Sequence, residues 1–303
     1  MFNLLFIGLN EDQLPYLYEL KKTNKFFIIG VDQNPNPLGK PYVNFFINKN
    51  YDLCDAIFYE IKKNNILNPI HYIFTASSQF SHRLASFIAS KFGIPYTPIE
   101  SIEIILNKYK FYKFLLNNSF PLPDSNFIEN ENHLNNFLKK INKNKFYYLK
   151  SDQSKNPNYV YKIEPLNFDF SIINWKRDRY LNYGYVLQEE VHGTHLRFNL
   201  YGNRFNVFDF FNDNKIQLLP KNRNIFIKIH NCLNNIVKKL DIINLLVKFD
   251  VIQYSDSFVI LDIGIDPPFR MLRYFQEQSL DFNKFYISHL LNGVISYPDI
   301  ADS

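Results

Sequence analysis

The sequence predicts an α/β protein whose N-terminal domain is a doubly wound parallel sheet, followed by an α+β fold in two subdomains. Three observations support this. Short apolar runs alternate with amphipathic helical segments over residues 1–95. Beyond residue 184, apolar runs follow one another across short turns, which is typical of antiparallel sheets. A chain of 303 residues is long enough for about two domains with sizeable cores.

Composition indicates an ordinary soluble globular chain, with 46% hydrophobic and 21% charged residues. The net charge is +5, but the sequence contains no block of five like charges, so a nucleic acid is weakly supported as a partner. The positive charge is compatible with a pocket for an anionic ligand. Cys54 and Cys232 lie far apart without metal-ligand spacing and are interpreted as reduced thiols of a cytoplasmic protein. No apolar run reaches membrane-spanning length, and residues 1–8 are interpreted as a strand, not a signal peptide. A homodimer is left open.

The N-terminal domain is assigned from alternating strands and helices. Strands are predicted at 4–8, 26–31 and 72–75, and helices at 12–22, 55–63 and 84–92. Ligands of such sheets bind beyond the carboxyl ends of the strands, where Gly8 and Asp32 lie. Residues 8–13 lack the three glycines of a dinucleotide fingerprint, which argues against NAD. Asp32 is either a ligand-facing acid or a loop cap.

The middle part begins after the boundary at residues 95–98. Ser101 is the expected N-cap of a helix, and 106–116 is helical in pattern. A strand (125–128), a helix (133–141) and two pairing strands (146–150 and 159–163) follow. The predicted domains are therefore 1–95, 96–184 and 185–303.

The last part is predicted to be mainly antiparallel. Runs at 185–191, 194–201 and 204–211 predict a meander, and 225–240 predicts a helix. Residues 247–265 predict a hairpin around the turn at 254–257, and 282–291 a final helix.

The predicted hairpin carries one carboxylate in each apolar run, Asp250 and Asp262. An acid in a half-buried strand is costly unless it is paired, hydrogen-bonded or bound to a metal. If the two carboxylates face each other, a divalent cation between them relieves their repulsion. The alternative is that both acids lie on a solvated strand face.

Basic and polar residues upstream of the hairpin likewise have both a functional and a purely structural interpretation. Lys150 closes an apolar strand and is placed to hold a phosphate, and Lys108 lies in a helical pattern, although each lysine alone is typical of a solvent contact. His195 and Arg197 have period-two spacing, so both side chains emerge on one face, where Arg197 could clamp a phosphate or carboxylate. The segment 188–191 is either an ordinary sheet edge or a strand that presents backbone groups to an adenine.

The order of these features resembles the ATP-grasp superfamily of carboxylate–amine ligases, preceded by its N-terminal domain, over nearly the whole chain. The matching stretches are Asn107-Lys108 through Pro121-Leu122-Pro123, Lys150, the hinge-like run Gln188-Glu189-Glu190-Val191-His192-Gly193, His195-Leu196-Arg197, Asp250, and Asp262-Ile263-Gly264.

The resemblance implies that ATP binds between two α+β subdomains. Lys108 and Lys150 are then expected on the phosphates, and Asp250 and Asp262 on Mg²⁺. Residues expected on the rest of the nucleotide are Gln188, Glu189, Glu190, Val191 and His195. Residues expected to act in catalysis are Arg197 and Arg270.

The expected reaction joins a small-molecule or peptide carboxylate, activated as an acyl phosphate, to an amine or related nucleophile. Three departures from the family pattern keep an alternative open. The loop 151–158 contains no glycine, Asp262 stands where Glu is usual, and Gly264 stands where an Asn ligand is expected. The alternative is a degenerate ATP-grasp protein that binds nucleotide or a partner without catalysis.

Overall fold

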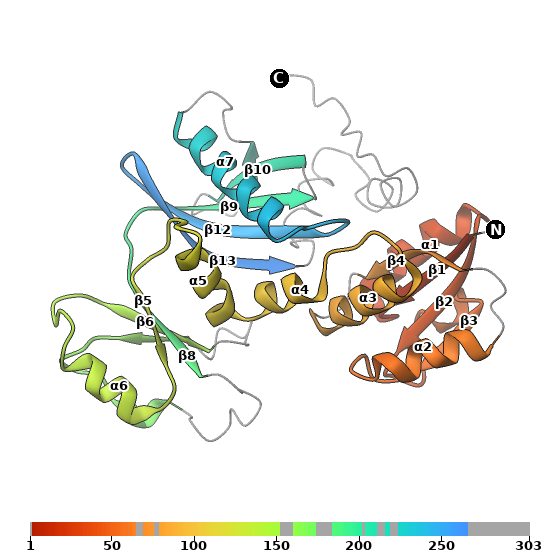
Figure 1. The fold of residues 1–303 in the computed structure, drawn as a ribbon, viewed down its shortest axis with the longest axis horizontal. Coiled ribbons are helices and arrows are strands. Elements are labelled where there is room, and N and C mark those ends of the chain that lie inside the picture. The colour runs from red at the N-terminus through yellow and green to blue at the C-terminus, as the bar shows by residue number, and fades with distance from the viewer. Residues whose placement is uncertain are drawn as a thin grey trace.

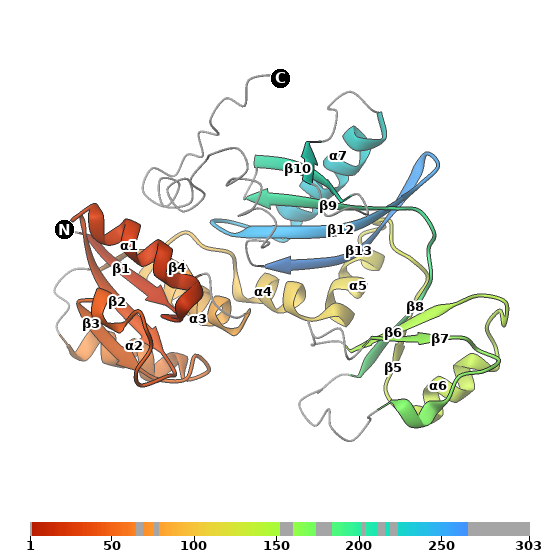
Figure 2. The ribbon, with the colours of Figure 1, turned by 180° about the vertical axis from the view of Figure 1, so that it is seen from behind.

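The structure is a computed structural model that describes residues 2–64, 69–75, 79–151, 160–173, 184–201, 204–210, 216–218 and 224–265. Within this part of the chain, the strands form three sheets (Figures 1 and 2). The N-terminal sheet lies at one end of the molecule, and a small and a large antiparallel sheet form the remainder. No helix in the described ranges is long and apolar enough to cross a bilayer.

The N-terminal sheet is parallel in every pair, with strand order β3-β2-β1-β4. Its elements are β1 (Phe2–Ile7), α1 (Leu14–Lys22), β2 (Phe26–Asp32), β3 (Phe45–Asn48), α2 (Cys54–Lys63), β4 (Ile70–Thr75) and α3 (Gln79–Phe92), with short 3-10 helices at Glu11–Gln13 and Lys40–Tyr42. Apolar residues of α2 and α3 pack together with those of β1 and β2 in one core. The predicted doubly wound domain is confirmed, although the short edge strand β3 was not predicted.

Asp32 ends β2 as a loop cap, the second of its two interpretations. Its carboxylate is 1% exposed, and it accepts hydrogen bonds from the backbone N–H of Leu9 (2.7 Å) and of Asn34 (2.8 Å). The acid is therefore used to close the two loops at this end of the sheet.

The small sheet has the order β5-β8-β6-β7 and is antiparallel throughout. Its strands are β5 (Ser125–Ile128), β6 (Tyr147–Ser151), β7 (Val160–Ile163) and β8 (Tyr185–Glu189). Helix α6 (Glu131–Leu138) packs on this sheet through Leu134 and Leu138. A 3-10 helix at Phe170–Ile172 follows β7.

The large sheet has the order β11-β10-β9-β12-β13. Its strands are β9 (Thr194–Tyr201), β10 (Arg204–Phe210), β11 (Ile216–Leu218), β12 (Leu246–Tyr254) and β13 (Ser257–Ile265). Alternate residues of β9 and β12 are fully buried against the amphipathic helix α7 (Asn224–Lys239) and against α4 (Ile99–Leu106) and α5 (Lys108–Asn117). The opposite face of β9, β12 and β13 carries the polar side chains and is called the polar face below.

Two predictions were wrong in ways that affect the site. Of the predicted meander, the pairing of 194–201 with 204–211 is confirmed, but 185–191 does not join it, because β8 pairs with β5 and β6 of the small sheet while β9 pairs with β10 and β12. Alternation of apolar residues cannot tell which sheet a strand joins. Ser101 is not an N-cap, because α4 already begins at Ile99 behind Pro98. The domain boundaries remain predictions. Strand β8 begins just after the predicted boundary at residue 184, but it pairs with β5 and β6, which precede that boundary.

Candidate nucleotide and metal site

The hairpin of β12 and β13 places Asp250 directly opposite Asp262. The register shifts immediately beyond this pair, because Val251 is paired with Ile260 and Leu261 is an extra residue in β13. A bulge of this kind bends the strand and re-aims the neighbouring side chains. The predicted juxtaposition of the two acids is therefore confirmed, and a bulge lies beside it.

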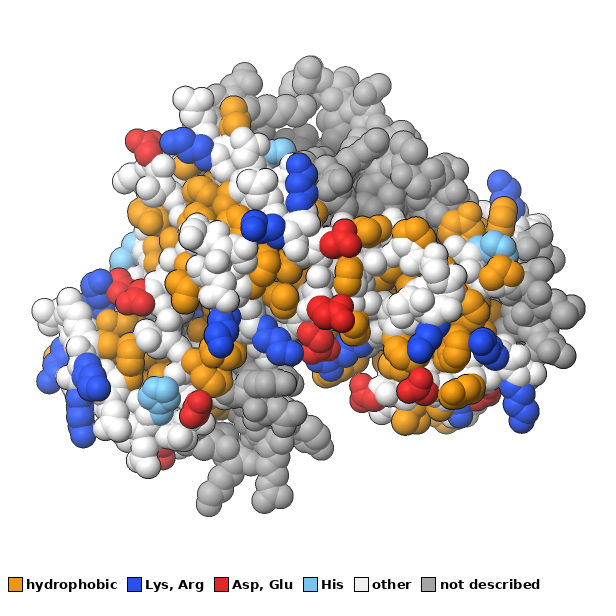
Figure 3. Space-filling view, in the orientation of Figure 1, with side chains coloured by type: hydrophobic (Ala, Val, Ile, Leu, Met, Phe, Trp, Pro, Cys, Tyr) orange, Lys and Arg blue, Asp and Glu red, His pale blue; other side chains and the backbone are white. Residues whose placement is uncertain are grey.

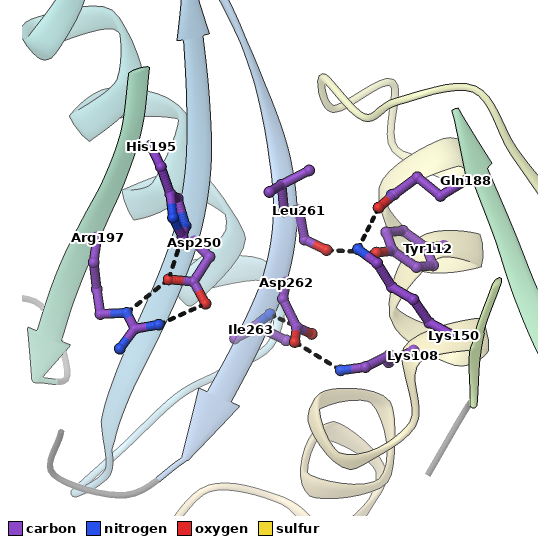
Figure 4. Close-up of polar contacts among 10 residues, drawn as sticks. All are labelled: Lys108, Tyr112, Lys150, Gln188, His195, Arg197, Asp250, Leu261, Asp262 and Ile263. Carbon is purple, nitrogen blue, oxygen red and sulfur yellow. Dashed lines mark hydrogen bonds and ion pairs between the residues drawn. The ribbon is translucent and has the colours of Figure 1, made fainter. Parts of the chain in front are cut away.

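Each of the two carboxylates is paired with a basic side chain (Figure 4). Arg197 on β9 stands opposite Asp250 and binds it with two hydrogen bonds, Nε to Oδ1 at 2.6 Å and Nη2 to Oδ2 at 3.0 Å. His195 lies on the same strand, with Nε2 3.4 Å from Oδ1 of Asp250. Burial raises the pKa of Asp250, but the hydrogen bonds from His195 and Arg197 outweigh it and hold this pKa well below its usual range.

Lys108 binds the second carboxylate from the start of α5. Asn107 ends α4 and caps α5, since its side chain accepts the backbone N–H of Lys110 at 2.8 Å. Lys108 is thus the first residue of α5, and its ammonium lies 2.6 Å from Oδ2 of Asp262. The cap fixes the start of the helix and with it the position of the lysine.

Lys150 reaches the same place from the small sheet. It lies on β6, and its Nζ donates to Oε1 of Gln188 on β8 at 2.5 Å. The pKa of Lys150 is lowered to about 8, chiefly by burial; Lys108 contributes to the lowering, whereas Asp262 and Asp250 oppose it. An anion bound beside this lysine would raise its pKa and favour the charged form.

Tyr112 joins α5 to the hairpin. It lies one helical turn after Lys108, and its hydroxyl donates to the carbonyl of Leu261, the bulge residue, at 2.5 Å. Burial and the charge of Asp262 raise the pKa of Tyr112 well above its usual range, so the phenol stays a donor. Sequence reasoning missed this residue, although its four-residue spacing from Lys108 placed both on one helix face.

The hinge segment, residues 188–191, connects the small sheet to the large one. The backbone N–H groups of Glu189 and Glu190 donate to the carbonyls of Asp124 and Phe146, each at 2.9 Å. The side chain of Gln188 is buried at 1% exposure and is used to hold Lys150. Gln188 therefore holds Lys150, the lysine that was predicted to bind a phosphate.

The two glutamates of the hinge segment make ion pairs within the small sheet. Glu189 pairs with Lys145 at 2.6 Å. Glu190 pairs with Lys162 at 3.0 Å and accepts the Tyr148 hydroxyl at 2.9 Å. Burial raises the pKa of Glu190, but Lys162 and Tyr148 reverse this and lower it. These side chains do not join Asp250 and Asp262.

The structure thus brings most of the predicted site residues together at the junction of the two antiparallel sheets (Figure 4). Lys248, which was not predicted, lies on the same face of β12 as Asp250, two residues before it. We call six of these residues the charged cluster: Lys108, Lys150, Arg197, Lys248, Asp250 and Asp262. The predicted Arg270 lies outside the described residues.

The donor set of the two aspartates suits Mg²⁺ only in part. Carboxylate oxygens are the ligands that Mg²⁺ prefers, and one or two of them suffice when phosphates complete the coordination. Both oxygens of Asp250 already accept from Arg197, and no group of three or more ligating His, Cys, Asp or Glu side chains occurs among the described residues. The pair therefore fits a magnesium ion that arrives with phosphates better than a bare ion.

The three sheets and their connections define the class: the chain has the ATP-grasp fold behind an N-terminal doubly wound domain. Among solved structures, the L-amino acid ligase from Bacillus licheniformis has a TM-score of 0.70 at 13% identity, covering 96% of this chain and 74% of that one. The N5-carboxyaminoimidazole ribonucleotide synthetase from Thermotoga maritima has a TM-score of 0.69 at 15% identity (96% and 76%). The D-alanine–D-alanine ligase from Bacillus anthracis has 0.64 at 12% (96% of both chains).

A curated relative is the uncharacterized protein MJ0776 of Methanocaldococcus jannaschii. The two are 30% identical over an alignment of 216 residues that covers 68% of this chain and 53% of the relative. The chain thus spans about half the length of this relative. No family model matches the chain.

Proposed function

We propose that the charged cluster binds the phosphates of ATP and that the protein is an ATP-dependent ligase joining a carboxylate to an amine. Among the described residues, the convergence of Lys108 from α5 and Lys150 from β6 on the aspartate pair carries the proposal. Basic side chains gathered in a partly buried site attract a polyphosphate. The solved structures that share the fold, which include ligases and synthetases, support it.

Individual roles follow from the contacts. Lys108 and Lys150 are assigned to the phosphates, and Asp250 and Asp262 to Mg²⁺, which when bound would neutralise charge on the transferred phosphoryl group. The hinge segment is assigned to the adenine, with the N–H of Val191 as donor, since the N–H groups of Glu189 and Glu190 are already bonded. His195, 51% exposed at its side chain, is assigned to the sugar side of the nucleotide.

The proposed reaction has two steps. A carboxylate oxygen of the substrate bonds to the γ-phosphorus, and the bond from this phosphorus to the bridging oxygen breaks, releasing ADP. The amine nitrogen then bonds to the acyl carbon, the carbon–oxygen bond to phosphate breaks, and the departing phosphate takes the amine proton. Arg197, and by sequence Arg270, would stabilise the transferred charge.

A binding protein without catalysis is the second candidate. Two observations favour it: both oxygens of Asp250 are held by Arg197, and Gly264 on β13 offers no side-chain ligand. This candidate predicts ATP binding that does not depend on Mg²⁺ and no ADP formation with any acid and amine.

Calorimetric titration with ATP, with and without Mg²⁺, tests the proposal. We expect Lys108→Met and Lys150→Met each to weaken binding by about tenfold or more, since each removes a phosphate contact. Lys113→Met is the matched control, because Lys113 lies on the exposed side of α5. Absence of ATP binding to the wild-type protein would refute both candidates, and ADP formation separates them.

A further inference from the structure

The Gln188 side chain is buried at the junction of the small and large sheets, where it meets three polar groups (Figure 4). Its oxygen Oε1 accepts the Lys150 ammonium at 2.5 Å, and its nitrogen Nε2 donates to Oγ of Ser125 on β5 at 3.5 Å. The amide also hydrogen-bonds the Tyr112 hydroxyl on α5. A side-chain amide has one oxygen and two N–H donors, so these three contacts engage the whole group.

The direction of each of these hydrogen bonds is set by the groups beyond it. The Ser125 hydroxyl donates to the carbonyl of Pro123 at 2.8 Å, and the Tyr112 hydroxyl donates to that of Leu261 at 2.5 Å. Each hydroxyl has one hydrogen, so both hydroxyl oxygens can only accept from the amide nitrogen of Gln188. Turning the amide over would break these contacts together. The amide is therefore held in one orientation.

In this orientation Gln188 presents a neutral acceptor to Lys150. An ammonium has three hydrogens, so the bond to Gln188 leaves two for other acceptors, such as phosphate oxygens. Lys108 is held differently, because its partner Asp262 is a carboxylate that offsets its charge. Gln188 thus orients Lys150 without neutralising it.

The contact between Gln188 and Tyr112 joins two parts of the fold. Gln188 on β8 and Lys150 on β6 belong to the small sheet, whereas Tyr112 packs in the core of the large sheet. Tyr112 in turn bonds Leu261, the bulge residue that precedes Asp262. A continuous chain of hydrogen bonds therefore runs from the lysine of one sheet to the aspartate strand of the other.

We propose that Gln188 is a positioning residue that fixes Lys150 for a phosphate and couples it, through Tyr112, to the bulge beside Asp262. This rests on the proposed binding of ATP phosphates at Lys150. The Gln188 side chain then acts on the triphosphate through the lysine and does not contact the adenine. Because the chain of bonds crosses between the sheets, the phosphate lysine and the assigned metal ligand are positioned together.

Calorimetric titration of the full chain with ATP tests this role, with inorganic tripolyphosphate and adenosine measured as competitors of ATP. Gln188→Leu should weaken ATP and tripolyphosphate by the same factor, about fivefold or more, and leave adenosine affinity within about twofold. A residue that contacts the adenine would give the reverse pattern. Gln33→Leu, at an exposed position of the N-terminal domain, is the matched control and should change none of the three affinities.

Two further variants test the chain of bonds itself. Ser125→Ala removes one hydroxyl that orients the amide, so it should weaken tripolyphosphate about two- to threefold, and it keeps the test open if Gln188→Leu does not fold. In the double variant Gln188→Leu/Tyr112→Phe, the loss of Mg²⁺-dependent tripolyphosphate affinity should be smaller than the product of the two single losses, because both changes cut one chain. Side chains that only fill space would give losses that multiply.

The outcomes separate this role from the proposed function. If Gln188→Leu and Ser125→Ala bind ATP and tripolyphosphate as tightly as wild type, or if the losses in the double variant multiply, the positioning role is refuted while the nucleotide site stands. A loss of adenosine affinity with unchanged tripolyphosphate affinity refutes it too, and assigns Gln188 to the adenine. If the wild type binds no ATP, the proposed function fails. Direct titration with tripolyphosphate then refutes the positioning role as well if binding is absent or is unchanged in Gln188→Leu.

Discussion

Arg197 and Asp250 stand opposite each other on β9 and β12, and the guanidinium binds both oxygens of the carboxylate. The side chains are 22% and 17% exposed, so the pair is largely removed from water. A forked pair of this kind fixes both geometry and charge. It holds one assigned metal ligand in place and limits how freely that ligand can coordinate.

Arg197→Met should destabilise the protein by about 3 kcal/mol, because among the described residues it leaves a largely buried carboxylate with His195 as its remaining basic partner. Urea unfolding at pH 7 measures this loss. Arg204→Met, at the first residue of β10, is a comparison on the next strand. An Arg197→Met protein as stable as wild type would show that the ion pair does not contribute to stability.

The ion pair of Arg197 and Asp250 should make the stability of the folded protein sensitive to acid. The folded pKa of Asp250 lies below its value in the unfolded chain, so its stabilising contribution is present above about pH 4 and is lost as the pH falls below that. Between pH 5 and 2, the wild type should therefore lose more stability than Arg197→Met. Urea midpoints at each pH check this, and parallel curves for the two proteins would contradict it.

Lys150 predicts opposite pH trends for binding and stability. Its pKa of about 8 is below the 10.5 of an ordinary lysine, because burial disfavours the charge. ATP binding should weaken as the pH rises above 8, since the ammonium is lost. Between pH 8 and 10.5, Lys150 carries its proton in the unfolded chain but has largely lost it in the folded protein, so its contribution raises the free energy of unfolding as the pH rises. In Lys150→Met both contributions should vanish, which titrations and unfolding from pH 7 to 10 would show.

Tyr112→Phe should destabilise the protein by about 1–2 kcal/mol, because the Leu261 carbonyl loses its donor. If the bond also holds the bulge beside Asp262, Mg²⁺-dependent ATP binding should weaken while Mg²⁺-independent binding does not. Tyr109→Phe, three residues earlier on α5, is the control. An equal loss of Mg²⁺-dependent ATP binding in both variants would show that the Tyr112 hydroxyl has no specific role in the site.

Much of the fold and part of the site could be predicted because the signals are local. The alternating runs of β12 and β13 with a two-residue turn between them predict the hairpin and its register near the turn. That register alone would place Asp250 opposite Leu261, and the bulge, which the sequence did not reveal, brings Asp262 opposite Asp250. Lys150 was predicted from its place at the end of an apolar strand. The family resemblance added Lys108, whose contact with Asp262 spans 154 positions in sequence.

The rest depended on information that no local pattern carries. Whether β8 joins the small or the large sheet is decided by its partners, and Gln188 is found to orient Lys150 only once that pairing is known. From the sequence, Asn199 is indistinguishable from an ordinary polar residue of an alternating strand. Its burial, and the absence of a hydrogen-bond partner for its side-chain oxygen within the described ranges, emerge only when the strands are assembled.

The start of β9 gives the last prediction, because Gly193 lies against the backbone of β12. A Cβ on Gly193 would be 2.2 Å from the carbonyl oxygen of Gln253, and a backbone atom within a paired strand cannot move aside. Gly193→Ala should therefore cost about 3 kcal/mol or more by displacing the strand that carries His195 and Arg197. Gly93→Ala is the matched control: Gly93 has a φ of +67° with nothing within 4 Å of its Cβ position, so only backbone strain of about 1 kcal/mol is expected. Urea unfolding of both variants compares the costs. Equal costs would mean that the entry to β9 is not held against β12 as the structure shows.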